Sequence, residues 1–182
     1  MDDEAVPLSG AVEADETFVG GKLRASDRRK LREQGIANRG PASKERSVVF
    51  GAVERGGRVR TTILGKSRNA AAASRALCEF VLPGSMIFTD DWGGYDPLAR
   101  MGYKRHRRIN HSARIYVQGD VHTQTIEGFF GLFKTGVRGA HHSVSYKWLQ
   151  GYLNEWTWRY NRRESETPMF RDLLNEAVSR TV

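Results

Sequence analysis

The alanine-rich segment at residues 69–81 constrains the fold of this chain more than any other feature. It contains four consecutive alanines followed by Leu77 and Phe80, and it ends before Pro83 and Gly84. Such a composition favours a helix, and the proline and glycine mark its end. Because segments with strand-like patterns lie on both sides, we predict a crossover helix, which connects strands of one sheet.

Three antiparallel strands are predicted before this helix. Residues 12–19 alternate in character and end at a glycine pair, which is typical of a strand closed by a turn. Residues 47–53 and 59–64 form a predicted β-hairpin, and two further glycines in the turn at 54–58 support it. Residues 22–46 are rich in Arg and Lys, so we expect an exposed basic insertion between the first strand and the hairpin.

The second half of the chain adds strands and helices. The short apolar run at 86–89 predicts a strand buried on both faces, and a further strand is expected at 103–110. Helical spacing is present at 96–101, 127–133 and 146–160. The predicted fold class is therefore α/β, with a mixed sheet whose first three strands are antiparallel and whose later strands are parallel, flanked by helices.

Apolar and aromatic side chains follow one side of the segment at 146–160. We predict that this stripe belongs to the core rather than to a surface that stacks on nucleic-acid bases. Its members are Trp148, Leu149, Tyr152, Leu153, Trp156 and Tyr160.

Size and charge narrow the function classes. The 182 residues fit one domain, 1–182, with a helical C-terminal part at 144–182. No apolar stretch approaches the roughly 20 residues that span a bilayer, and the acidic N-terminus differs from a signal peptide.

The single Cys78 can form neither an internal disulfide nor a zinc ribbon, so the cytoplasm is the expected compartment. The net charge of +8 favours nucleic acid over a membrane as partner, although a basic protein without a specific anionic partner is the alternative.

Clusters of acidic residues interrupt this basic chain at three places. Asp15 and Glu16 lie in the first strand, and because neighbouring side chains of a strand point to opposite faces, only one of them is a ligand candidate. Asp90 and Asp91 follow the buried strand at 86–89, and Glu127 begins a predicted helix. Carboxylates bind the divalent cations that assist phosphodiester cleavage, so this pattern indicates metal-dependent chemistry on nucleic acid.

A set of motifs lies at residues 12–22, 89–95, 110–112, 122–130, 133–134 and 159–163. Together these motifs resemble the catalytic domain of bacterial insertion-sequence DDE transposases. The group is the one whose catalytic domain normally follows a zinc ribbon (ISXO-type), and this chain is expected to lack that N-terminal module. The resemblance runs from about Leu8 to about Arg163 and implies a ribonuclease-H-like fold.

The resemblance implies a role for each acidic cluster. Asp15, Asp90 and Glu127 correspond to the three metal-binding catalytic carboxylates, which are expected to hold two Mg²⁺ ions, with Mn²⁺ as a substitute. Lys134, seven residues after Glu127 and on the same helix face, is expected to bind phosphate, and a solvated lysine is the alternative. Asp91 stands where relatives usually have glycine, and its alternative role is to cap the following turn.

Other residues in the matching motifs are possible DNA contacts. Their alternative roles are structural, because a lone histidine usually belongs to the core and a helix C-terminus favours cations. Gln124 stands where relatives commonly carry asparagine, and this difference leaves the carboxylate of the third acid in place. The possible DNA-binding residues are His111, His122, Arg159, Arg162 and Arg163.

The implied activity is cleavage and strand transfer of DNA during transposition, with transposon ends and target DNA as partners. A homo-oligomer is expected, because two transposon ends must be joined. Two alternatives stay open at this point: a ribonuclease-H-like nuclease without strand transfer, and an inactive DNA-binding remnant.

Overall fold

The computed structural model describes residues 6–20, 33, 46–109, 122–141 and 144–179. The expected basic insertion at 22–46 lies almost entirely outside these residues, and so does His111.

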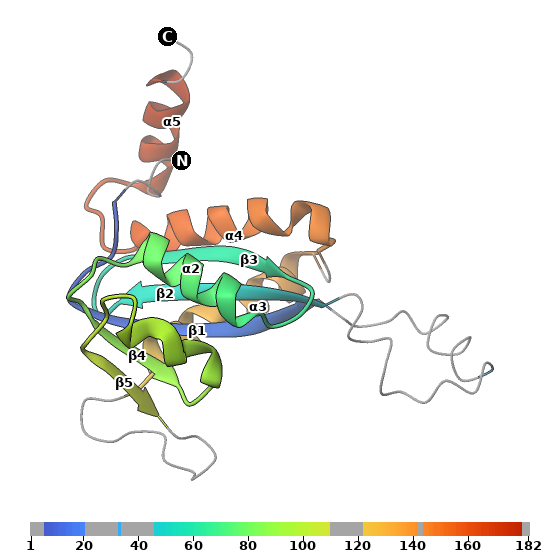
Figure 1. Ribbon diagram of the computed structural model, residues 1–182. Coiled ribbons are helices and arrows are strands. Elements are labelled where there is room, and N and C mark those ends of the chain that lie inside the picture. Colours follow the sequence, from blue (N-terminus) through green and yellow to red (C-terminus); the bar gives the residue numbers. More distant parts are fainter. Residues whose placement is uncertain (1–5, 21–32, 34–45, 110–121, 142–143, 180–182) are drawn as a thin grey trace.

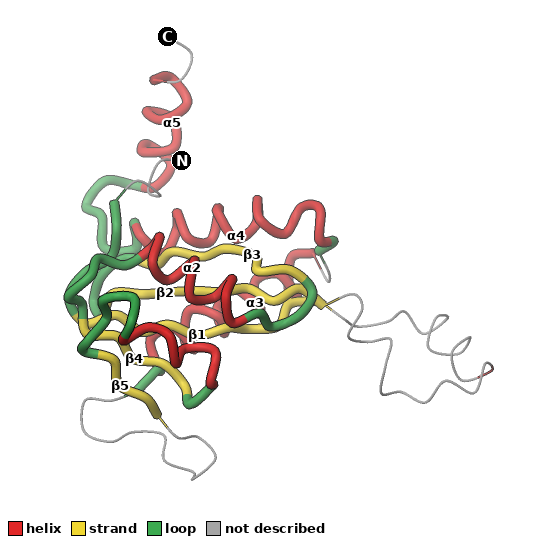
Figure 2. The backbone as a smooth tube through the Cα atoms, in the orientation of Figure 1, coloured by secondary structure: helices red, strands yellow, loops and turns green. Residues whose placement is uncertain are grey.

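Five strands of the described chain form one mixed sheet in the order β3-β2-β1-β4-β5 (Figures 1 and 2). The central strand β1 pairs antiparallel with β2 on one side and parallel with β4 on the other. This arrangement confirms the predicted mixed sheet and is compatible with a ribonuclease-H-like fold. The strands are β1 (Ala11–Gly20), β2 (Arg46–Glu54), β3 (Val59–Gly65), β4 (Met86–Asp90) and β5 (His106–Ile109).

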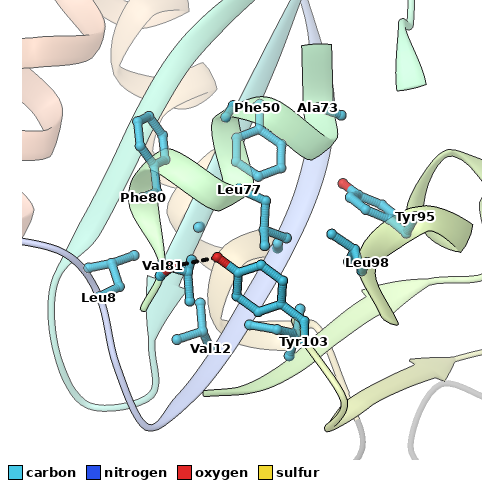
Figure 3. Close-up of a cluster of buried hydrophobic side chains, with 14 residues drawn as sticks. Leu8, Val12, Phe50, Ala73, Leu77, Phe80, Val81, Tyr95, Leu98 and Tyr103 are labelled. Carbon is cyan, nitrogen blue, oxygen red and sulfur yellow. Dashed lines mark hydrogen bonds between the residues drawn. The ribbon is translucent and has the colours of Figure 1, made fainter. Parts of the chain in front are cut away.

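The predicted crossover helix is α2 (Ala70–Phe80), which covers one face of the sheet (Figure 1). It begins where the Asn69 side chain accepts a hydrogen bond of 3.0 Å from the backbone N–H of Ala72, a standard helix cap. Its apolar side, with Leu77 at the centre, packs against Phe50 and neighbouring residues of the sheet (Figure 3). Burial of this apolar surface fixes the helix on the sheet.

Two predicted elements between α2 and the C-terminal helices have different bounds. Of the strand expected at 103–110, β5 is the part that the described residues form. The Tyr103 side chain instead turns into the core and donates a hydrogen bond of 2.6 Å to the Val81 carbonyl (Figure 3). The helix expected at 96–101 is instead the 3₁₀ helix η2 (Gly93–Ala99). It contains Pro97, whose nitrogen cannot donate a backbone hydrogen bond.

The opposite face of the sheet is covered by α3 (Gln124–His141), which is longer than the predicted helix at 127–133. Glycines inside α3 made this length hard to predict, because glycine disfavours helices. The structure explains one of them, since a Cβ at Gly136 would lie 1.9 Å from the Trp156 ring. Close packing against a neighbouring helix thus requires glycine at this position.

That neighbouring helix is α4 (Tyr146–Asn161), where the predicted apolar stripe is only partly core. Leu149 and Leu153 are buried, but Trp148 is 62% exposed, so its assignment to the core was wrong. The stripe is wider than the contact between α4 and the rest of the fold, and residues at its edge remain in solvent.

The last described helix, α5 (Met169–Ser179), projects away from the body (Figure 1) and has no buried residue. It is tied to α4 by a hydrogen bond of 3.0 Å from Trp158 Nε1 to Glu176. No described helix combines the length and apolar character that crossing a bilayer requires.

Candidate functional site

Two of the predicted acids come together where β4 ends. In the parallel register of β1 and β4, Glu13 lies beside Phe88. Asp15 and Asp90 stand two residues further along each strand, and therefore on the same face of the sheet. The two carboxylates interact, since the charge of Asp90 affects the pKa of Asp15.

Asp15 has an unusual protonation equilibrium. The pKa of Asp15 is raised to about 7, mainly because the side chain is buried and, to a smaller extent, because the negative charge of Asp90 is near. A hydrogen bond of 2.7 Å from the Glu16 N–H and the positive charge of Arg68 oppose this rise without cancelling it, and the charge of Glu16 adds to it. The environment thus disfavours a second negative charge beside Asp90, and a cation between the two carboxylates would relieve the repulsion.

Glu16 points to the opposite face of β1, as the strand alternation predicted. Its side chain is fully buried and accepts a hydrogen bond from the Tyr95 hydroxyl. Its second oxygen, Oε2, makes no hydrogen bond among the described residues, although Arg68 Nε lies 3.5 Å away. Burial raises the pKa of Glu16 to about 7; Tyr95 and Arg68 oppose the rise and Asp90 adds to it.

Arg68 connects the acids of both faces, a role that we did not predict from the sequence. Besides Glu16, its guanidinium lies 3.9 Å from Asp90 Oδ2. It also lies over the rings of Trp92, at 5.1 Å, and Phe18, at 6.0 Å. A single arginine before a helix cap carries no pattern that would have pointed to this contact.

Asp91, the neighbour of Asp90, is exposed. The turn that follows is capped by Asp90 instead, whose Oδ1 accepts a hydrogen bond of 3.2 Å from the Trp92 N–H. The capping role that was left open for Asp91 is therefore filled by Asp90.

The third predicted acid, Glu127, lies in the first turn of α3 and is exposed. Thr123, just before the helix, donates a hydrogen bond of 2.8 Å to Glu127 Oε1. Within the described part of the chain, no three Asp, Glu, His or Cys side chains are grouped to hold a metal ion. Asp15 and Asp90 suit a hard cation, because they offer carboxylate oxygens and a cation would relieve the repulsion between them. Glu127 lies on α3 and is not grouped with these two acids.

Lys134 lies two turns further along α3 and is half-buried. Its ammonium donates a hydrogen bond to the hydroxyl of Thr17, which shares a face of β1 with Asp15. Burial lowers the pKa of Lys134, with repulsion from Arg138 adding to the effect and the negative charge of Asp15 opposing it. The structure thus brings Lys134 within electrostatic reach of Asp15.

Four of the predicted DNA contacts lie among the described residues, and each has a partner within the chain. His122 Nδ1 lies 3.1 Å from a carboxylate oxygen of Glu13. Arg159 pairs with Glu155 at 2.8 Å, Arg162 pairs with Glu176 at 2.7 Å, and Arg163 donates a hydrogen bond of 3.0 Å to the Gly57 carbonyl. These contacts match the structural alternatives, and DNA binding by these residues stays a prediction.

Sequence reasoning also missed Glu13. This glutamate is fully buried on the face of β1 that carries Asp15, and it binds the N-terminus of α3. Its position on the same strand face was visible in the alternation, but its partners on α3 lie more than 100 residues away in sequence.

A family model for the ISXO2-like transposase domain matches residues 7–161. The chain belongs to this transposase family. The resemblance inferred from the motifs is therefore confirmed, and the site lies within the matched part of the transposase domain.

The transposase domain is also similar to a protein of Halobacterium salinarum described as an uncharacterized protein in the transposable element ISH50. The two are 29% identical over 149 residues, which cover 80% of this chain and 50% of the relative. The chain thus spans about half the length of this curated relative. No solved structure matches the chain.

Proposed function

We propose that this transposase domain catalyses divalent-metal-dependent cleavage of DNA strands and their transfer during transposition of an insertion sequence. The observation that carries the proposal is the meeting of Asp15 and Asp90 beneath the helix that bears Glu127 and Lys134. Membership of the transposase family and the net charge of +8 support DNA as the partner.

In this proposal, Asp15, Asp90 and Glu127 are the ligands of two Mg²⁺ ions, for which Mn²⁺ can substitute. Bound divalent ions stabilise the attacking and leaving oxygens of an in-line displacement at phosphorus. A carboxylate must lose its proton to bind a metal, and the pKa of Asp15 is about 7. Metal binding is therefore expected to weaken as the pH falls below 7.

Lys134 would bind a DNA phosphate beside the acids. The Thr17 hydroxyl holds the ammonium on the Asp15 side of α3, where a backbone phosphate would meet the lysine and the metal site together. A positioned cation of this kind stabilises charge that develops in a phosphoryl-transfer transition state.

Transposition joins two ends of an element, so we also propose that the protein acts as a homo-oligomer on DNA. Light scattering coupled to size exclusion, with and without a duplex from the element's ends, measures the mass of the complex. A single copy bound to one duplex under conditions that support joining would contradict this part of the proposal.

The chemistry is tested with purified protein, supercoiled plasmid and a labelled duplex from the ends of the element that encodes the chain. Reactions contain Mg²⁺, Mn²⁺ or a chelator, and nicked and joined products are followed on gels. The informative variants are Asp90→Ala and Glu127→Ala. Asp91→Asn is the matched control, because it removes an exposed carboxylate directly beside Asp90.

Joined products that require metal and disappear in Asp90→Ala and Glu127→Ala, but persist in Asp91→Asn, would support the proposal. Nicking without joining would instead assign a nuclease that lacks strand transfer. Binding of DNA with no cleavage under any metal would assign an inactive remnant.

A further inference from the structure

The buried carboxylate of Glu13 caps a helix that lies far away in the sequence. Its Oε2 accepts hydrogen bonds from the backbone N–H groups of Thr125, at 2.7 Å, and Ile126, at 3.2 Å. Its Oε1 accepts a third, at 3.0 Å, from the Thr125 hydroxyl. Amides in the first turn of a helix have no partner within the helix, so this carboxylate satisfies two of them across 112 and 113 residues of chain.

The same carboxylate is held from its other side by Arg55. Arg55 Nε donates to Glu13 Oε1 at 2.8 Å, and Nη2 donates to the His122 carbonyl at 3.0 Å, just before α3. The Arg55 guanidinium also stacks 4.0 Å from the centre of the Phe88 ring on β4. Glu13 and Arg55 therefore join β1, β4 and the start of α3 in one network.

Because of this network, the Thr123 hydroxyl does not have the usual role of a threonine at the start of a helix. A threonine just before a helix commonly caps the first amides with its own hydroxyl. Here Glu13 binds the amides of Thr125 and Ile126, and the Thr123 hydroxyl donates to Glu127 Oε1. The capping carboxylate from β1 thus leaves Thr123 available to orient the third acid.

A second contact sets the position of α3 along β1. Glu13 binds α3 at residue 126, and Thr17 binds it at Lys134. Eight residues of helix rise about 12 Å, and four residues of strand rise about 13 Å, so the two spacings match. Asp15 lies midway between the two anchors on the same strand face.

We propose that Glu13 is a positioning residue that holds the start of α3, and with it Glu127, at a set distance from Asp15 and Asp90. It acts through the helix and does not touch DNA or metal itself. The inference rests on the proposed function, because it assigns to the network the task of completing the metal site. Residues behind metal ligands commonly change metal affinity by about 10- to 100-fold when replaced.

The test compares Glu13→Gln with Glu54→Gln in the full chain. Glu54 is the matched control, since its carboxylate also accepts two backbone N–H bonds, but from Ser9 and Arg58, neither of which belongs to α3. Thr125→Val is a milder variant that keeps the side-chain shape and removes one hydrogen bond to Glu13. Hydrogen exchange reports on residues 123–130, and calorimetric titration with Mg²⁺ reports on metal affinity.

We expect Glu13→Gln to speed exchange in residues 123–130 and to weaken Mg²⁺ binding by about 10-fold or more. Thr125→Val should change the exchange rate and the Mg²⁺ affinity in the same directions to a smaller extent, and Glu54→Gln should change neither quantity. Unchanged exchange, or faster exchange with unchanged Mg²⁺ affinity, would overturn the positioning role. Failure of the unmodified protein to bind Mg²⁺ would instead overturn the proposed function, so the two failures are distinguishable.

Discussion

Gly51 on β2 lies directly opposite Asp15 on β1, and α3 packs onto the sheet at this point because Gly51 has no side chain. A Cβ at Gly51 would lie 2.8 Å from both Ile126 and Phe130. Such contacts are too short to be accommodated unless these two side chains, or α3 itself, shift. The packing of the helix above the acids therefore depends on a glycine in the neighbouring strand.

Gly51→Ala is expected to destabilise the fold by about 1–3 kcal/mol, because overpacking forces side chains and backbone to shift. Denaturant unfolding followed by circular dichroism measures the effect. Gly131→Ala is the control, since a Cβ there meets nothing within 4 Å and alanine favours a helix by up to about 1 kcal/mol. Equal stability of the two variants would contradict this account of the packing.

The raised pKa values of Asp15 and Glu16 predict how stability depends on pH. Both values are about 7, above the ordinary values of 3.8 and 4.5, so the folded state binds more protons than the unfolded state between these limits. Stability without divalent cations should therefore fall as the pH rises from about 4 to 7. Thermal unfolding over this range, in the presence of a chelator, measures the trend.

Asp15→Asn should remove part of this dependence. We expect a gain on the order of 1 kcal/mol at pH 8, or roughly 2–4 °C in Tm, and little change at pH 4, where Asp15 is largely protonated. A loss of stability at pH 8 would show that the carboxylate is stabilised in the fold rather than strained. Addition of Mg²⁺ at pH 8 should stabilise the unmodified protein and not the variant.

Tyr95→Phe should make the fold more sensitive to high pH. The Tyr95 hydroxyl donates to Glu16, and this hydrogen bond favours the charged carboxylate. Without it the pKa of Glu16 rises further, so we expect a loss of about 1–3 kcal/mol that is larger at pH 8 than at pH 5. Tyr103→Phe removes another buried hydroxyl, bonded to the Val81 carbonyl, and should cost the same at both pH values.

Lys134→Met should lower DNA cleavage without unfolding the protein. Removal of one positioned charge from a phosphoryl-transfer site commonly lowers the rate by about 10²–10³-fold. Single-turnover cleavage at saturating DNA separates this loss from weaker binding. Arg138→Gln, one turn further along α3 and exposed, is the control that removes a positive charge away from Thr17. A similar loss in both variants would indicate a general effect of charge.

The sequence by itself determined most of the strands and helices, and the family. Each strand and helix that was correctly predicted depends on local periodicity or on a local signal such as the Asn69 cap, and both act over a few residues. The opposite orientations of Asp15 and Glu16 followed from the same periodicity. The motifs around Asp15, Asp90 and Glu127 then identified the transposase family.

Only the tertiary structure decided how the site is assembled. The contacts of Glu13 with α3 and of Arg68 with Asp90 join residues that no local pattern connects. The exposure of Trp148 depends on how far α4 extends past its neighbours, and the need for glycine at Gly51 depends on α3. Such features arise from packing between segments distant in sequence, whereas periodicity reports only which face of each segment is apolar.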